Sequence, residues 1–323
     1  MTRKNESFLF YDSIDDDVYT ERMIIFATCE NVQLLRDSRE WFLDGTFAVC
    51  PLIFRQLYTI HVMLPEGKTV PVVYALLASK NGVTYRKLLN RIVDALGGSY
   101  PQLLIHTDFE FSMIKEIEAI FPTARILGCA FHFNQCVWRH IQSDSALLRK
   151  CRENVDFFLE VRMFTALAFV PAQETRSMFE LLLSSQFVQD NYYILTPFIN
   201  YFENTWVGRA RNPPLMKIEW WNVYQSTLNG TARTNNAAEA WHSAFSGRLG
   251  VSHPSFFKLV GDIQQEQGNT EYLETNSSAQ GNAAAPRAVY RDLQRRLFEL
   301  VSDYPNNGGL RFLRNIAHNI KFK

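Results

Sequence analysis

A run of strand-like segments in the first third of the chain restricts its fold more than any other feature. Three β-rich runs follow one another at residues 41–50, 54–64 and 69–78. Short turns at Pro51 and at residues 65–68 separate them, and strands joined by such short turns pair in the antiparallel sense. The sequence therefore predicts an antiparallel meander.

Helix-like and strand-like segments alternate after the meander. The apolar residues of segment 84–96 recur at helical spacing, and Gly97 ends this segment. A strand-like run, a helix and a second buried-type strand follow, at residues 101–108, 111–121 and 124–131. The order β-β-β-α-β-α-β predicts a mixed α/β fold in which two strands suit a parallel sheet.

The strand pattern disappears after His132, and helical patterns rich in aromatic residues replace it as far as Gly230. A further helix begins at Thr234, and a basic final helix is expected over residues 289–301. Small and polar residues fill the stretch 268–286, which is typical of a flexible connection. This pattern divides the chain into an N-terminal lead-in, the first part of an α/β core, a helical insertion, the final helices of the core, a flexible linker and a basic helical tail, at residues 1–36, 37–142, 143–230, 231–266, 267–286 and 287–323.

The composition is that of a globular protein. Apolar residues make up 47 % of the sequence and aromatic residues 14 %, which is enough to fill a core. No apolar run approaches the roughly 20 residues of a membrane helix, and the N-terminus is acidic where a signal peptide needs an apolar stretch. We therefore expect a protein that stays inside the cell. The odd set of cysteines is expected to be reduced: Cys29, Cys50, Cys129, Cys136 and Cys151.

The formal net charge is zero, which argues mildly against a nucleic-acid partner, but the charges are unevenly distributed. Residues 1–47 carry 5 basic and 10 acidic residues, whereas residues 286–323 carry 8 basic and 3 acidic residues. Arginines neutralise phosphates without reading sequence. The candidates for this role are Arg209, Arg211, Arg233, Arg287, Arg291, Arg295 and Arg296. A solvated helix face explains the last four equally well.

Two aspartates lie in or directly after apolar strand patterns. Asp44 stands among Phe42, Leu43 and Phe47, where a carboxylate without a partner costs several kcal/mol. Taken alone, however, Asp-Gly is a common turn dipeptide. Asp108 ends the strand LLIHTD, at the position where ligands bind in α/β sheets, although an aspartate there is also a good helix N-cap.

A third acid, Glu239, lies near the start of the helix that begins at Thr234. Alone it is an ordinary first-turn acid favoured by the helix dipole. The combination is more informative, because an RNase H-like fold has acids on its first strand, after its fourth strand and on a late helix. Three clustered carboxylates repel unless cations lie between them, and Mg²⁺ or Mn²⁺ prefers such oxygen ligands. His242 shares a helix face with Glu239. Two interpretations of this histidine are open: a metal or phosphate ligand, and a packing role.

Cysteine and histidine form a second constellation. Cys129-x-x-His132 is half of a zinc site, and no matching second pair follows. His132, Cys136 and His140 recur every four residues on one helical face. The spacing suits structural Zn²⁺ bound by Cys129 and His132, and it also suits a buried helix face.

Four strings together resemble, in order, the transposase domain of Mutator-like elements (MULE): FLDGTFAVCPLIFRQLYTIHV (42–62), LLIHTDFE (103–110), GCAFHFNQCVWRHIQ (128–142) and TNNAAEAWHSAF (234–245). The resemblance extends over roughly residues 22 to 250. It implies a DDE-type transposase with an RNase H-like core, a mixed five-stranded sheet flanked by helices, and a large all-α insertion before the last catalytic helix. Carried over position by position, it implies Asp44, Asp108 and Glu239 as the catalytic metal ligands and Cys129 with His132 as the C-x-x-H pair.

The resemblance also implies metal-dependent cleavage and strand transfer of DNA in the nucleus, with two Mg²⁺ or Mn²⁺ ions. The expected partners are transposon ends and target DNA, and a homo-oligomer is left open. Many relatives carry a zinc-binding DNA-recognition module ahead of this domain, and the sequence has no upstream Cys/His cluster. The alternative is therefore a domesticated, non-catalytic DNA-binding or regulatory protein, as with the plant far-red response regulators that resemble the family. A ribonuclease of the same fold would lack the helical insertion.

Overall fold

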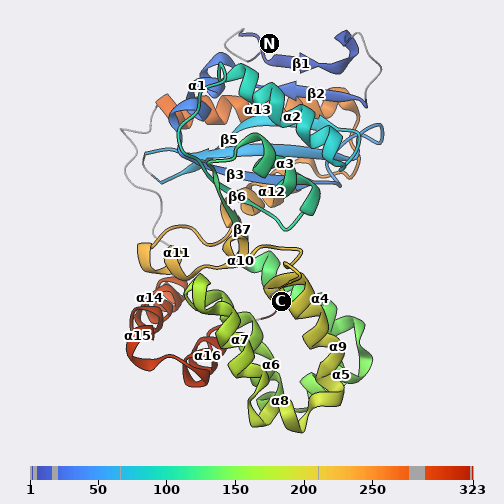
Figure 1. Cartoon of the computed structure of the whole chain (residues 1–323). Coiled ribbons are helices and arrows are strands. Elements are labelled where there is room, and N and C mark those ends of the chain that lie inside the picture. The colour runs from blue at the N-terminus through green and yellow to red at the C-terminus, as the bar shows by residue number, and fades with distance from the viewer. Residues whose placement is uncertain are drawn as a thin grey trace. The chain divides into compact units, whose positions relative to one another are not determined.

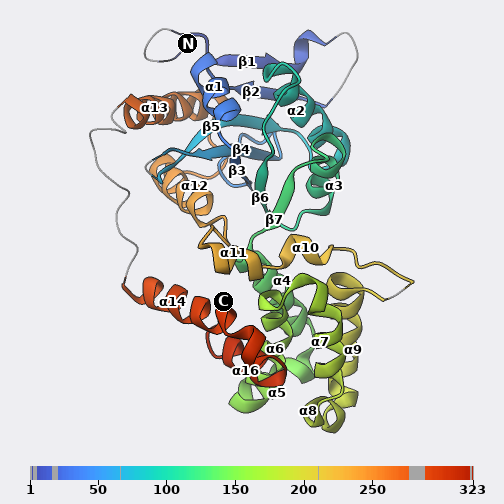
Figure 2. The ribbon, with the colours of Figure 1, turned by 60° about the vertical axis from the view of Figure 1, so that its left-hand side comes forward.

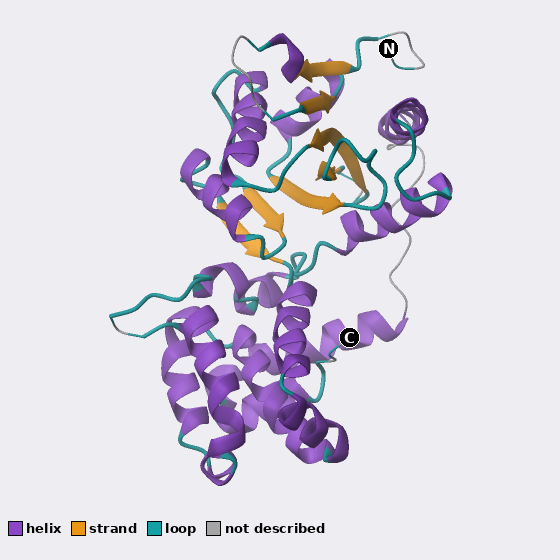
Figure 3. Cartoon of the chain, turned by 90° about the vertical axis from the view of Figure 1, so that its right-hand side faces the viewer, coloured by secondary structure: helices purple, strands orange, loops and turns teal. Residues whose placement is uncertain are grey.

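The computed structural model describes residues 2, 6–16, 21–65, 67–209, 211–275, 288–320 and 322. The chain forms two compact units, one of residues 1–126 and 235–284 and the other of residues 127–234 and 285–323. Strands are characteristic of the first unit, whereas the second is built of helices and loops (Figure 3).

A seven-stranded sheet forms the centre of the first unit (Figure 1). Its order is β1-β2-β5-β4-β3-β6-β7. Neighbouring strands pair in the antiparallel sense from β1 to β3, and β3 pairs with β6 in parallel. The predicted meander and the mixed α/β class are confirmed. The strands are β1 (Leu9–Asp12), β2 (Met23–Phe26), β3 (Glu40–Thr46), β4 (Gln56–Met63), β5 (Thr69–Leu77), β6 (Leu104–Thr107) and β7 (Arg125–Gly128).

The sheet has seven strands where the sequence led us to expect five. The segment interpreted as an N-terminal lead-in supplies the two additional strands, because Met23–Phe26 pairs with the edge of β5 and β1 pairs with β2. Every residue of β2 is buried, so this strand has no alternation of polar and apolar residues to reveal it. The backbone groups of an open strand edge need partners; β2 supplies them for β5, and β1 supplies them for β2.

Helices cover both faces of this sheet, with α2 and α3 on one side and α12 and α13 on the other (Figure 2). Side chains that cap the first turn explain where two of the helices start: Thr28 accepts from the backbone N–H of Asn31 in α1, and Asn81 accepts from that of Thr84 in α2. The helices of this unit are α1 (Cys29–Asp37), α2 (Gly82–Ala95), α3 (Phe111–Ile120), α12 (Asn236–Leu249) and α13 (Phe256–Thr275).

Helix α13 continues to Thr275, so the prediction of a flexible linker from residue 267 is wrong for its first part. Gln267 is fully buried, and its side-chain amide donates to the Asn31 side chain at 2.9 Å. A small polar stretch thus packs inside the unit because its polar groups find hydrogen-bond partners there. Residues 276–286 of the expected linker, and Arg287, lie outside the described residues.

The core beneath α12 and α13 is continuous with the sheet. Phe245 and Leu249 of α12 and Leu259 of α13 belong to one buried cluster with Leu57 and Leu76 of the strands. Burying an aliphatic or aromatic side chain of this size contributes roughly 1.5–3 kcal/mol. This packing fixes the side of the sheet on which α12 presents its first turn.

The second unit confirms the predicted helical block. Phe133 lies at its centre, stacked on Trp221 at 5.0 Å between ring centroids and edge-on to Trp206 at 4.8 Å. Trp206, Trp220 and Trp221 are buried, in line with a core role. The helices are α4 (Ala130–Ser143), α5 (Ser145–Glu153), α6 (Val155–Ala166), α7 (Thr175–Leu183), α8 (Gln186–Asp190), α9 (Tyr192–Phe202), α10 (Ile218–Trp221), α11 (Tyr224–Asn229), α14 (Ala288–Ser302), α15 (Tyr304–Asn307) and α16 (Leu310–Ala317).

All five cysteines are free thiols, as expected. In the part of the chain that the structure describes, no helix combines the length and the apolar character needed to cross a membrane.

Candidate functional site

The pairing of β3 with β6 brings two of the predicted acids to one level of the sheet. Phe42 pairs with His106 in parallel register, and their rings stack at 4.4 Å with an interplanar angle of 8°. Side chains of a strand return to the same face every two residues. Asp44 and Asp108 follow these two residues by two positions each, so continuing the register past the end of β6 would bring them to one level, on the face that carries the stacked rings.

Asp44 is a strand residue, which excludes the turn interpretation of the Asp44-Gly45 dipeptide. It lies within β3 opposite Thr59 of β4, and only 7 % of it is exposed. The backbone N–H of Gly45 donates to Asp44 Oδ1 at 2.8 Å, and Nε2 of His242 lies 3.6 Å from Asp44 Oδ2. These neighbours account for a carboxylate in an otherwise apolar strand.

Gly45 is required by the close approach of β4. A Cβ atom at this position would lie 2.7 Å from Oε1 of Gln56 and 2.9 Å from Cδ2 of Tyr58. Real Cβ atoms do not come this close to other heavy atoms, so a larger residue would force the side chains of Gln56 and Tyr58, or the strand itself, to shift. The glycine thus keeps the strand that carries Asp44 close to its partner strand.

Asp108 follows β6 directly and is half-buried. The alternative of a helix N-cap is wrong, because Glu110 occupies that position before α3. Glu110 instead accepts a hydrogen bond from the Tyr85 hydroxyl at 2.7 Å and pairs with Lys80 at 2.9 Å. Asp108 thus follows its strand at the mouth of the sheet, two residues before the N-cap position of α3.

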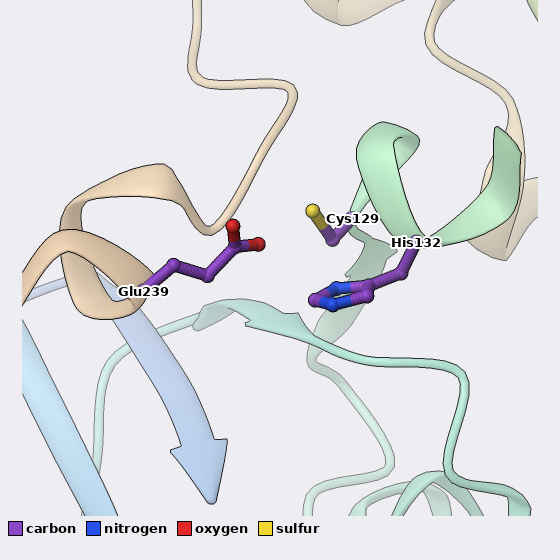
Figure 4. Close-up of side chains that lie close together, drawn as sticks. All are labelled: Cys129, His132 and Glu239. Carbon is purple, nitrogen blue, oxygen red and sulfur yellow. The ribbon is translucent and has the colours of Figure 1, made fainter. Parts of the chain in front are cut away.

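Helix α12 is anchored to β3 at its N-terminus. Asn235 precedes the first turn, and its side-chain amide donates to the backbone oxygen of Leu43 at 2.8 Å. Glu239 lies in this first turn (Figure 4). Its backbone N–H donates to the Asn235 oxygen at 3.0 Å. His242 follows Glu239 by three residues and therefore shares its helix face. The anchor places that face over the strand that carries Asp44.

Both aspartates affect the pKa of His242. Burial lowers the pKa of His242 to about 4, although the backbone of Asp44 and the charge of Asp108 raise it. Burial, and then the charge of His242, hold the pKa of His61 well below its usual range. Both imidazoles are thus neutral at neutral pH, and neither supplies positive charge to balance the acids.

The three acids do not form one tight cluster of oxygen atoms. Of the described residues, Asp44, Asp108 and Glu239 do not form a set whose oxygen atoms all lie within 4.8 Å of one another. Two metal ions roughly 3.5–4 Å apart, each about 2.1 Å from its oxygens, can nevertheless be held by acids as far as about 8 Å apart. A metal site at these three acids therefore stays a prediction.

The C-x-x-H pair belongs to the second unit. Cys129 precedes α4 and His132 lies in its first turn, with Sγ and a ring nitrogen within 4.8 Å of each other (Figure 4). Further along α4, the His140 ring stacks on Tyr201 at 3.7 Å, which is a packing role. A structural zinc ion needs four ligands, so zinc at Cys129 and His132 remains a prediction.

The arginines proposed for DNA contact differ in their surroundings. Arg209 is paired with Glu203 at 2.5 Å, and Arg233 donates to Thr227 and Gln294 within the helical unit. Arg295 is 68 % exposed and lies within 4 Å of Asp292 and Glu299. Arg211, Arg291 and Arg296 are exposed. Exposed guanidinium groups suit phosphate contact, and the contacts of Arg233 suit a structural role.

Sequence reasoning missed Thr59, His61 and Asn235. The first two are polar residues of β4 that are fully buried, and they lie inside an apolar strand pattern as Asp44 does. The same argument that singled out Asp44 could have found them. Asn235 had only its position before a helix, which indicated a cap and not an anchor to another strand.

Residues 40–136 match the family model of the MULE transposase domain. The matched segment begins on β3 and ends within α4, so it includes Asp44, Asp108, Cys129 and His132 and stops before Glu239. The family resemblance is confirmed over this segment. No curated protein and no solved structure matches the chain.

Proposed function

We propose that this chain carries the catalytic domain of a DDE-type DNA transposase, which cleaves DNA and transfers strands with the help of divalent metal ions. The observation that carries the proposal is the position of Asp44 on β3 and of Asp108 directly after β6, two strands that pair in parallel within the segment that matches the MULE domain. Glu239 completes the set from a helix that is anchored to the strand of Asp44.

The order of the strands supports an RNase H-like core. Strands β3 to β7 lie in the order β5-β4-β3-β6-β7. The first acid lies on the first of these five strands, the second directly after the fourth, and the third on the helix that follows the long helical segment. In this interpretation β1 and β2 extend the core sheet, and the helical segment 143–230 is an insertion before the last catalytic helix.

The donor set fits Mg²⁺ or Mn²⁺. Asp44, Asp108 and Glu239 offer only carboxylate oxygens, the ligands that these ions prefer. These three residues would hold the ions, which would stabilise the attacking and leaving oxygens of a phosphodiester. The neutral imidazole of His242 leaves the charge of the acids for the cations to balance. The bond between Gly45 and Asp44 Oδ1 restricts the rotation of the carboxylate.

DNA is the partner that this activity requires. The exposed side chains of Arg211, Arg295 and Arg296 would neutralise backbone phosphates of transposon ends and target. In a cell with a nucleus this activity would take place there, and a homo-oligomer that holds two DNA ends fits the same function.

One observation favours a second candidate, a domesticated regulatory protein that binds DNA without cutting it. The oxygens of the three acids are not gathered within 4.8 Å, and a chain that no longer binds metal is under no requirement to gather them. The two candidates differ in what a metal ion does to DNA in the presence of the protein.

The test is a titration of the full chain with Mn²⁺ in the presence of labelled DNA, in which nicking of the DNA is measured. We expect nicking in the native chain that is absent from Asp44→Asn and Asp108→Asn, which remove charge with little change in volume. Asp94→Asn changes an exposed acid of α2, 69 % accessible at its side chain, and should nick normally. Nicking by all three variants would overturn the assignment, and DNA binding without nicking by the native chain would support the regulatory candidate.

A further inference from the structure

Three buried side chains form a hydrogen-bonded chain behind Asp44. The Thr59 hydroxyl oxygen lies 2.8 Å from Nε2 of His61, 3.0 Å from Nε2 of His242 and 3.4 Å from the backbone oxygen of Asp44. Thr59 and His61 are fully buried, and His242 is 7 % exposed. These hydrogen bonds join two residues of β4 to one of α12. Thr59 and His242 are 183 residues apart in the sequence.

The three contacts are compatible with only a few proton arrangements. A hydroxyl donates one hydrogen bond and accepts two, and a neutral imidazole donates one. Within the described residues, Nδ1 of His61 and Nδ1 of His242 have no hydrogen-bond partner. A buried N–H without an acceptor is costly, so each ring carries its proton on Nε2. Both rings then donate to Thr59, whose hydroxyl donates to the Asp44 backbone oxygen.

This arrangement restrains the carboxylate of Asp44 from two sides. Oδ1 accepts from the backbone N–H of Gly45 at 2.8 Å, and Oδ2 faces Nε2 of His242 at 3.6 Å. The bond to Thr59 fixes the orientation of the His242 ring, because its Nε2–H is already engaged there. The position of the ring in turn limits the movement of Oδ2.

Aromatic packing holds the far end of the chain. Trp241 lies edge-on to His61 at 5.2 Å, and its indole N–H donates to Glu266 of α13 at 2.8 Å. Glu266 also pairs with Arg248 of α12 at 2.5 Å. The contacts with α13 and the anchor to β3 thus both restrain α12, which carries His242, from rotating about its axis.

We propose that Thr59, His61 and His242 are positioning residues that hold the Asp44 carboxylate in the orientation in which it binds a divalent cation. The inference rests on the proposed function, because it assigns these residues a purpose only if Asp44 is a metal ligand. Hydrogen-bonded neighbours of metal ligands typically change metal affinity about 10–100-fold when they are mutated. The effect should therefore appear in metal binding itself, before any DNA is cut.

The experiment compares Thr59→Val with Thr59→Ser by calorimetric titration of the full chain with Mn²⁺ alone. Valine keeps the shape of threonine and lacks the hydroxyl, whereas serine keeps the hydroxyl. We expect Thr59→Val to weaken Mn²⁺ binding about 10–100-fold and Thr59→Ser to bind nearly as the native chain does. A purely structural role would lower the stability of Thr59→Val without changing the affinity of the folded protein.

Asp44→Asn separates the two proposals. Loss of Mn²⁺ binding in Asp44→Asn together with native affinity in Thr59→Val would overturn this inference and leave the metal site standing. Native affinity in Asp44→Asn would overturn the metal site itself. If thermal unfolding shows that Thr59→Val does not fold, the comparison moves to His242→Gln, which keeps an N–H donor, and His242→Leu, which does not. Equal Mn²⁺ affinities in that pair would equally refute the inference.

Discussion

The ring of Phe42 lies almost parallel to the ring of His106, at 4.4 Å between centroids, and this contact joins the two strands that carry the candidate acids. Both residues are buried. Nε2 of His106 also lies 2.7 Å from Oε1 of Glu40, within hydrogen-bonding distance. Asp44 and Asp108 follow this pair by two residues each, so a shift of one strand against the other would separate the acids.

Phe42→Leu is expected to weaken metal binding more than its effect on stability suggests. Leucine keeps an apolar side chain and removes the stack, which contributes about 0.5–1.5 kcal/mol beyond buried area. Ile105→Val is the matched control, because Ile105 is buried one residue before His106 and points to the other face, and such a change costs about 0.5–1.5 kcal/mol. Urea unfolding and Mn²⁺ titration measure the two effects. Equal Mn²⁺ affinities in the two variants would show that the stack does not align the acids.

The sequence was sufficient for the features that depend on local pattern. Meander, crossover helices and helical block each have a periodicity, and Asp44 stands out because a carboxylate interrupts an apolar strand. The contact of Thr59 with His242 could not be predicted, because it joins positions 183 residues apart through the packing of α12 on the sheet. Strand β2 could not be predicted either, because it is four residues long and buried throughout, which leaves no alternation of polar and apolar residues. The polar character of Gln267 indicates a linker, and its buried position depends on the hydrogen bond to Asn31, which the sequence does not reveal.

Divalent metal should stabilise the native chain and leave Asp108→Asn unchanged. A ligand at about 100 times its Kd adds about 2.7 kcal/mol to the free energy of unfolding. Without metal, Asp108→Asn should be at least as stable as the native chain, because it removes one of two neighbouring negative charges. Thermal unfolding with and without Mn²⁺ measures both effects. A metal-dependent gain in Asp108→Asn equal to that of the native chain would count against Asp108 as a ligand.

Gly45→Ala should destabilise the first unit by about 1–3 kcal/mol, the usual cost of an overpacked core. The new Cβ would meet Gln56 at 2.7 Å and the ring of Tyr58 at 2.9 Å. Gly261→Ala is the control, because Gly261 lies in α13 and a Cβ added there would have no neighbour within 4 Å. There alanine should stabilise by up to about 1 kcal/mol. Denaturant unfolding of both variants distinguishes crowding at Gly45 from a general glycine effect.

Stability should depend on pH through Asp16. Its carboxylate accepts from Lys87 Nζ at 2.5 Å and from the Tyr11 hydroxyl at 2.6 Å, and these bonds, that of Lys87 most, lower the pKa of Asp16. A lowered pKa stabilises the fold above the unfolded value of about 3.9, and this contribution is lost as the pH falls through the folded pKa. Asp16→Asn should therefore lose less stability than the native chain between about pH 5 and pH 3. Asp15→Asn, an exposed neighbour, should behave as the native chain, and identical pH profiles for all three proteins would refute the role of Asp16.

Asn235→Ala should loosen the start of α12 and move Glu239 away from β3. The Asn235 side chain is fully buried and donates to the Leu43 oxygen at 2.8 Å, and a buried acceptor that loses its donor costs about 1–3 kcal/mol. Asn236→Ala removes the same amide from an exposed neighbour and should cost much less. Hydrogen exchange at the Glu239 N–H, which donates to the Asn235 backbone oxygen, reports the loosening directly. Faster exchange in Asn235→Ala than in Asn236→Ala, with weaker Mn²⁺ binding, is the expected result, and equal exchange rates would show that the helix start does not depend on this anchor.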